Sequence, residues 1–242
     1  MCTRFYIESN LQPALESVKL NPLTSWMQEI FDKRVILTGE VRPTDIAAVI
    51  ASNRRGVRTV FPMIWGFTRP VSQTQENGQL KAKQKQTTPI VNCRVETAAT
   101  KDFWRDSWLH HRCIVPASYY FEWGQPHNLL STLTPEDGRV NSSSHNKKQI
   151  VGKKARKTRK VKYAIQPENN LITYLAGLYR LENGYPHFAI LTREPGEEIR
   201  FIHNRMPVVL EANQIDAWIN PEASPEVIVQ TAITKMEYME IN

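Results

Sequence analysis

The sequence predicts an α+β fold, a single domain with a curved, barrel-like mixed β-sheet core and peripheral helices. Short runs rich in β-branched and aromatic residues recur between turn signals, and helical patterns are few and separated. The chain of 242 residues, 41% of them hydrophobic, suits one sizeable core. We therefore expect residues 1–242 to form one domain, with a polar, basic insertion at about 125–160.

The first half begins with a short strand around Phe5–Ile7 and continues with a helical stretch over 11–33. Pro22 should divide this stretch into two helices, because proline ends or begins a helix rather than continuing it. The expected apolar side of the stretch consists of Leu15, Val18, Trp26, Ile30 and Phe31. Two strands, DIAAVIA at 45–51 and RTVFPMIWGF at 58–67, follow it. The almost wholly polar residues 71–88 should be a loop.

The second half alternates short strands with two helices. A strand in PIVNCRVET leads to a helix over TKDFWRDSWLHH, where three aromatic residues share a face. Four strands are expected in RCIVPASYYFEW, ITYLAGLYRL, HFAILT and RMPVVL. NQIDAWI is the last expected helix.

The net charge of +7 is concentrated in one segment. Residues 147–162 hold nine Lys or Arg and no acid, so the rest of the chain has 22 of the 31 basic residues against 24 Asp and Glu. The segment suits a solvated insertion as well as an arm that grips a DNA strand. Both interpretations stay open.

The composition indicates neither a membrane protein nor a secreted one. No apolar run approaches the roughly 20 residues that span a bilayer, and the first residues lack a secretion-signal pattern. Three cysteines, Cys2, Cys93 and Cys113, form an odd count that fits a reducing compartment. We expect a cytoplasmic monomer.

A zinc site could be imagined from Cys93, Cys113 and the adjacent His110 and His111. The chain contains neither the CxxC nor the HxxxH spacing of many structural zinc sites. We expect no metal and no cofactor.

Several strand ends carry polar residues where a buried strand would be apolar. These residues are Asn92, Arg94, Glu96, Glu122, His203 and Arg205. Each has an ordinary explanation when taken alone. Strand alternation favours a solvent-facing Glu122, His203 can cap a helix end, and Arg94 and Glu96 can form a surface pair.

The four elements that contain such residues also occur in a particular order. The MCxRF start, the NxRxET element, the FEW element and the HNRMP element resemble the SOS-response-associated peptidase (SRAP) family of abasic-site-processing proteins. The intervening GEVRPTDIAAVI, PMIWGF and TYLAGLYR segments are similar to the family too, so the resemblance covers nearly the whole chain.

The resemblance implies a covalent reaction at Cys2 with abasic sites in single-stranded DNA. The small side chain at position 2 permits removal of Met1, which leaves Cys2 with a free α-amine beside its thiol. An α-amine with a pKa of about 7.7–8.0 is substantially neutral at cell pH. It can form a Schiff base with the ring-opened sugar aldehyde, and the thiol can then close a five-membered thiazolidine ring.

The same resemblance implies the other site residues. Glu122 resembles the acid/base carboxylate of the family, His203 the residue that assists sugar ring opening, and Asn92 the side chain that orients the cysteine. The expected DNA-binding residues are Arg4, Arg94, Arg205 and Thr192.

The chain departs from the family pattern at four places. Cys93 stands where the family commonly has a small residue, and we expect it to be a buried structural thiol. Thr3 stands where the family usually has glycine, and the basic insertion is longer than typical. The tryptophan that usually follows the WGxxP-like element is missing, which leaves Trp65 or Phe67 as candidates for stacking on bases.

Two other functions are compatible with the residues. A thiol peptidase would use Cys2 as nucleophile and His203 as base, with its own N-terminus as one conceivable substrate. A noncovalent single-stranded DNA-binding protein would keep the arginines without the reaction. The product separates the three functions: a heat-stable DNA adduct, peptide fragments, or a salt-sensitive complex.

Overall fold

The computed structural model describes residues 2–69, 73–76, 79–82, 88–126 and 160–241. The insertion expected at about 125–160 lies almost wholly outside these residues. Within the described ranges, no helix is both long and apolar enough to cross a bilayer.

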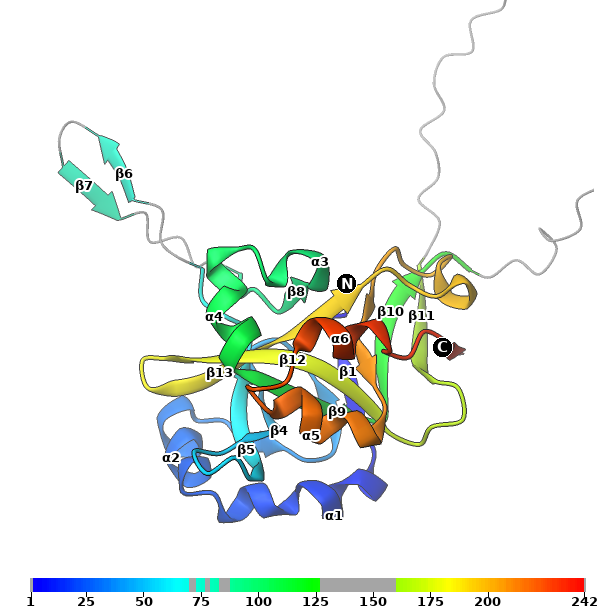
Figure 1. Cartoon of the computed structure of the whole chain (residues 1–242), viewed down its shortest axis with the longest axis horizontal. Coiled ribbons are helices and arrows are strands. Elements are labelled where there is room, and N and C mark those ends of the chain that lie inside the picture. The colour runs from blue at the N-terminus through cyan, green and yellow to red at the C-terminus, as the bar shows by residue number, and fades with distance from the viewer. Residues whose placement is uncertain (1, 70–72, 77–78, 83–87, 127–159, 242) are drawn as a thin grey trace, which may run out of the picture.

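Five strands close into a mixed β-barrel, which confirms the predicted fold class (Figure 1). They are β4 (Ile46–Ser52), β5 (Arg58–Trp65), β9 (Arg112–Ala117), β12 (Thr173–Glu182) and β13 (Tyr185–Arg193). Antiparallel pairs run from β5 through β4, β9 and β12 to β13, and a parallel β13–β5 pair closes the ring. Short strands extend this sheet, namely β2 (Val35–Ile36), β8 (Asn92–Arg94), β14 (Met206–Pro207) and β15 (Val209–Leu210).

The barrel strands are apolar on both faces because each face meets a different core. Val115 of β9, with Phe188 and Ile190 of β13, belongs to the core shared with a second sheet. Ile114 and Ala189, their neighbours in the chain, belong to the core under the helices. Alternation along each strand therefore produces the nearly continuous apolar runs in the sequence.

The second sheet is antiparallel and has the strand order β16–β11–β10–β1–β3. Its strands are β1 (Phe5–Ile7), β3 (Gly39–Val41), β10 (Tyr119–Gly124), β11 (Val161–Pro167) and β16 (Met236–Ile241). Phe5 pairs with Tyr120, and Glu122 pairs with Tyr163. The N-terminal residues therefore lie directly beside β10, the strand of the FEW element.

The helices lie on the outside of the two sheets (Figure 1). They are α1 (Gln12–Leu15), α2 (Pro22–Phe31), α3 (Val95–Ala98), α4 (Asp102–His110), α5 (Ile215–Ile219) and α6 (Pro225–Gln230). Short 3₁₀ helices are formed by Ser9–Leu11, Glu16–Leu20, Glu197–Ile199 and Ala212–Gln214.

The helical stretch near the N-terminus divides at Pro22 as expected. The Asn21 side chain accepts a 3.1 Å hydrogen bond from the Leu23 N–H and so caps α2. The expected apolar side is wrong in part, because Trp26 and Ile30 are 55% and 48% exposed. The residues of α2 that are buried instead are Thr24 and Met27.

Three elements differ from the expectations. The described parts of the expected loop over 71–88 contain a hairpin, β6 (Gln73–Glu76) paired with β7 (Gln79–Ala82). The helix in NQIDAWI is not the last, since α6 follows it. The C-terminal strand β16 joins the second sheet.

Buried Arg112, at the start of β9, ties together the ends of two helices. Its guanidinium donates to the carbonyls of Trp108 (2.9 Å) and Leu109 (2.7 Å) near the end of α4. It also donates to the carbonyls of Trp218 (2.7 Å) and Asn220 at the end of α5. Carbonyls in the last turn of a helix have no intrahelical donor, so one side chain satisfies two sets of them.

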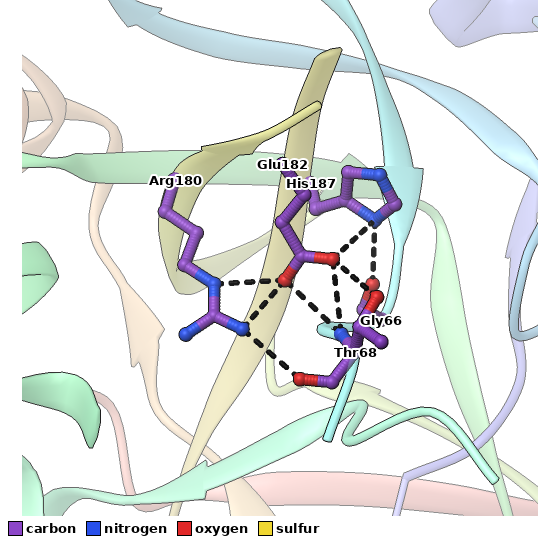
Figure 2. A network of polar contacts seen from close by, with 5 residues as sticks. All are labelled: Gly66, Thr68, Arg180, Glu182 and His187. Carbon is purple, nitrogen blue, oxygen red and sulfur yellow. Dashed lines mark hydrogen bonds and ion pairs between the residues drawn. The ribbon is translucent and has the colours of Figure 1, made fainter. Parts of the chain in front are cut away.

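A polar network fixes the chain where it leaves the barrel after β5 (Figure 2). The Glu182 carboxylate accepts from the Thr68 N–H (3.0 Å), the Thr68 hydroxyl (2.5 Å) and the Arg180 Nε (2.8 Å). His187 Nδ1 lies 2.8 Å from the Gly66 carbonyl oxygen. Burial raises the pKa of Glu182, but these hydrogen bonds outweigh burial and lower it overall. The segment before the β6–β7 hairpin is thus held to the β12–β13 turn.

Candidate functional site

Cys2 lies just before β1 and is fully buried. Its thiol donates to the Arg4 carbonyl over 3.7 Å, and its own carbonyl accepts a 2.8 Å hydrogen bond from Asn92 Nδ2. Burial raises the pKa of the Cys2 thiol, and the charge of Glu122 raises it further. The thiol is therefore neutral in this state.

Asn92 reaches Cys2 from β8, which pairs in parallel with β13 through Asn92 and Ile190. Its amide nitrogen is used by the bond to Cys2. Its Oδ1 is buried and accepts no hydrogen bond within the described part of the chain. The Asn92 amide thus holds Cys2 through its Nδ2 donor, while its Oδ1 remains as a buried acceptor.

Glu122 is 4% exposed, so the solvent-facing alternative favoured by strand alternation is wrong. Both faces of β10 are covered. On the outer face, Lys162 Nζ lies 3.6 Å from the Phe121 ring centre and the Arg4 guanidinium lies 5.1 Å from the Trp123 ring centre. Glu122 faces inward and interacts electrostatically with Cys2. A buried carboxyl group beside a thiol is suited to proton transfer.

His203 lies in the loop before β14. Its Nδ1 lies 3.0 Å from the backbone nitrogen of Arg205 and 3.1 Å from the Arg205 carbonyl oxygen, so Nδ1 accepts from the first or donates to the second according to the tautomer. The same loop packs closely on the end of β10. A Cβ placed on Gly124 would lie 2.7 Å from the Ile202 Cα, so only glycine permits this approach. Gly124 therefore brings the loop of His203 to the strand of Glu122.

The three arginines of the expected DNA-binding set have different surroundings. Arg4 donates to Glu40 Oε1 (2.9 Å), which also accepts from the Arg42 Nε. Arg205 forms two hydrogen bonds with Glu96 (2.6 and 2.8 Å), and these bonds lower the pKa of Glu96. Arg94 is exposed, and no described residue accepts a hydrogen bond from its side chain. A phosphate would find Arg94 available and would compete with carboxylates for Arg4 and Arg205.

Thr192 is fully buried, and its hydroxyl donates to the Cys93 carbonyl over 3.2 Å. This bond joins β13 to β8, next to Asn92. The hydroxyl of Thr192 is therefore engaged between the two strands in this conformation, and its contact with a phosphate stays a prediction.

The two aromatic candidates for base stacking are wrong. Trp65 and Phe67 are both fully buried, and Trp65 stacks on Phe188 at 5.9 Å between ring centres. Trp123 is half-buried, and the structure places it beside the basic side chains of Arg4 and Lys162 instead.

Sequence reasoning missed Gly124, Glu40 and Tyr120 as parts of the site. A glycine within a strand pattern indicates a close backbone approach, so Gly124 did carry a signal. Glu40 and Tyr120 have no local signature, because the residues that mark their place in the site, Arg4 for Glu40 and Cys2 for Tyr120, lie far away in the chain. Among the described residues, no three His, Cys, Asp or Glu side chains gather in a way that could hold a metal ion.

The sequence of this chain matches one family model and resembles several curated proteins. The model of the family described as SOS response associated peptidase (SRAP) matches residues 1–141 and 149–242. The chain is 25% identical over 244 residues to the abasic site processing protein YoaM of Bacillus subtilis, covering 94% of this chain and 83% of YoaM. It is 23% identical over 248 residues to YoqW of the same organism, also named an abasic site processing protein, covering 96% and 86% of the two chains.

Solved structures share the fold at low sequence identity. A protein from Bacteroides thetaiotaomicron superposes with a TM-score of 0.61 at 20% identity, covering 100% of this chain and 92% of the other. A phage-related protein from Bordetella bronchiseptica superposes with a TM-score of 0.62 at 17% identity, covering 100% and 94%.

Proposed function

The chain belongs to the SOS response associated peptidase (SRAP) family, and from this we propose that it acts on abasic sites in single-stranded DNA. In this proposal, Cys2 captures the lesion covalently after Met1 has been removed. The names of the curated relatives, abasic site processing proteins, support the class of lesion. The observation that carries the proposed chemistry is the position of Cys2, held by Asn92 and adjoined by the buried Glu122.

The proposed reaction releases one water and needs no oxidant or reductant. The Cys2 amine attacks C1′ of the opened sugar, and loss of the aldehyde oxygen as water leaves an imine. The sulfur then adds to the same carbon while its proton passes to the nitrogen. The product is a five-membered thiazolidine ring that contains both the nitrogen and the sulfur of Cys2.

The raised pKa of the thiol fits this order of steps. A neutral, buried thiol is a poor nucleophile, so the amine attacks first and the thiol reacts only after the imine has formed next to it. Glu122 is placed to move protons between the amine, the leaving water and the thiol. His203, through Nε2, would donate to or accept from the sugar oxygen during ring opening.

Phosphate groups on either side of the lesion would bind the arginines. Arg94 is available, and Arg4 and Arg205 would exchange Glu40 and Glu96 for phosphate oxygens. A phosphate suits the bidentate geometry in which Arg205 now binds Glu96. We propose a cytoplasmic monomer with this activity.

The thiol-peptidase alternative receives less support from the site. A catalytic cysteine requires a lowered thiol pKa, whereas burial and Glu122 raise that of Cys2. A peptidase would also need a histidine paired with the thiol. His203 Nδ1 instead contacts the backbone of Arg205, at 3.0 Å from its nitrogen and 3.1 Å from its carbonyl oxygen.

Intact mass spectrometry of the purified protein tests the proposal, with and without single-stranded DNA that contains one abasic site. We expect a chain without Met1 that gains the mass of the DNA less one water, in an adduct that survives heating. Cys2→Ser should form no such adduct. Cys113→Ala, which removes another fully buried thiol, should form it as wild type does. Peptide fragments without an adduct would favour the peptidase, and a complex that heat destroys would favour noncovalent binding.

A further inference from the structure

Among the described residues, the hydroxyl of Tyr120 is buried without a partner. Tyr120 is fully buried in β10, and its oxygen makes no hydrogen bond within the part of the chain that the structure describes. Tyr163, one strand away and equally buried, donates to the Gln125 carbonyl at 2.8 Å and contacts Glu240 Oε1 at 3.1 Å. Most buried polar groups are paired, because an unpaired one has lost its hydrogen bonds to water without a replacement. An unpaired hydroxyl at a site therefore requires an explanation.

This hydroxyl belongs to the side of β10 that faces Cys2. Tyr120 and Glu122 are two residues apart in a strand and so point to the same face. The Arg4 carbonyl accepts both from the Cys2 thiol (3.7 Å) and from the Phe121 N–H (2.9 Å). The thiol is thus anchored beside the peptide that joins Tyr120 to Phe121, and Cys2 and Tyr120 share one core cluster.

The phenol can act here as a hydrogen-bond donor but not as a base. Burial raises the pKa of Tyr120 well above its usual value, and electrostatic interaction with the ionisable groups of Cys2 and Glu122 raises it further. The group therefore keeps its proton around neutral pH. Asn92 Oδ1, also buried and unpaired among the described residues, offers an acceptor at the same site.

The captured sugar carries a hydroxyl that also requires a hydrogen-bond partner when it is buried. Its 3′ and 5′ oxygens are bound in phosphodiesters and C1′ is bound to Cys2, so the C4′ oxygen freed by ring opening is its remaining hydroxyl. Burying that hydroxyl without a partner would carry the same penalty as leaving Tyr120 unpaired.

We propose that Tyr120 donates a hydrogen bond to the C4′ hydroxyl of the opened sugar and so holds the lesion in place for capture by Cys2. The inference rests on the proposed function. It adds a residue that recognises the ring-opened form, because the closed ring has no hydroxyl at C4′.

Tyr120→Phe removes the donor and keeps the ring. In single-turnover capture at saturating abasic single-stranded DNA, we expect adduct formation to slow by roughly 3- to 10-fold, the value of one hydrogen bond. The melting temperature should stay the same or rise, because the lost hydroxyl was unpaired. Tyr163→Phe is the matched control, and it should lower the melting temperature while capture continues at the wild-type rate.

A second substrate separates hydrogen bonding from a general effect on the site. DNA that carries an acyclic aldehyde of the same length without the hydroxyl should be captured at equal rates by wild type and Tyr120→Phe. Equal slowing on both substrates would overturn the proposal, as would a wild-type rate on the natural lesion. A fall in melting temperature of Tyr120→Phe would show that the hydroxyl was already paired, with the same consequence. A wild-type protein that forms no adduct would overturn the proposed function together with this inference.

Discussion

Asn92 donates a 2.8 Å hydrogen bond to the carbonyl oxygen of Cys2, although 90 positions separate the two residues. The bond depends on β8, a strand of three residues that is held to the barrel by its parallel pairing with β13. Thr192 adds a side-chain bond between the same two strands. The geometry of Cys2 is therefore set by the barrel.

Asn92→Ala should slow capture of abasic DNA by roughly 10-fold, because it frees Cys2 and leaves the buried carbonyl of Cys2 without a donor. Single-turnover adduct formation measures the effect. Asn21→Ala is the control, since it removes the cap of α2 and should lower the melting temperature without slowing capture. Capture at the wild-type rate by Asn92→Ala would show that the bond to Cys2 does not position the reactant.

Glu122→Gln should slow adduct formation by about 10²–10⁴-fold, the usual contribution of a positioned acid/base. Noncovalent affinity for abasic DNA, measured in a Cys2→Ala background, should change little. Glu182→Gln is the control for the loss of a carboxylate elsewhere in the fold. It weakens the network in Figure 2 and should lower the melting temperature without changing the rate of adduct formation. An equal rate for Glu122→Gln and wild type would remove Glu122 from the mechanism.

Arg94→Ala should reduce the slope of log affinity against log salt concentration by about 0.7, the contribution of one phosphate contact on single strands. The same loss is expected for Arg205→Ala, with a lower melting temperature because Glu96 loses its partner. Arg58→Ala is the control, since Arg58 lies 3.7 Å from Asp216 of α5 and is not expected to contact DNA. Unchanged slopes in both test variants would place the DNA elsewhere.

Gly124→Ala should lower both stability and reactivity. The added methyl group would lie 2.7 Å from the Ile202 Cα and must push away the loop that carries His203. Overpacking of this kind costs about 1–3 kcal/mol. Gly56→Ala is the comparison, because it strains a backbone with positive φ while its methyl group would have no atom within 4 Å. A capture rate that falls equally in the two variants would show that the contact with Ile202 is unimportant.

Cys93 should resist alkylation in the folded protein. Burial raises its pKa to about 12, so on the order of 10⁻⁴ of the thiol is ionised at pH 8. Iodoacetamide at that pH should leave Cys93 unmodified in the time that labels all cysteines of the denatured chain, as mass spectrometry of tryptic peptides will show. Rapid native labelling would mean that β8 opens readily.

The sequence predicted the fold class well because the barrel strands are buried on both faces and therefore read as short apolar runs. It predicted the site residues from four sequence motifs that occur in a particular order along the chain. The structure brings Cys2, Asn92 and Glu122 together. The roles of these residues remain predictions. Residues 71–88 and Trp26 were misread, because a hairpin and an exposed tryptophan have no clear local pattern.

The burial of Glu122 could not be derived by alternation. Its neighbours Phe121 and Trp123 are aromatic and would normally face a core, yet the side chains of Lys162 and Arg4 cover them on the outer face. That cover comes from other strands. The unpaired hydroxyl of Tyr120 is likewise visible only when every described neighbour is in place.

The guanidinium of Arg112 makes the ends of α4 and α5 depend on each other. If either helix end frays and displaces the Arg112 guanidinium, the carbonyls of the other helix end lose their hydrogen-bond donor. We therefore expect the two ends to open as one cooperative unit with similar hydrogen-exchange protection. The helices α4 and α5 contribute tryptophans to the core that packs against β9. The strand that follows β9 in the chain is β10. Local melting on this side of the molecule is therefore expected to involve both helix ends together.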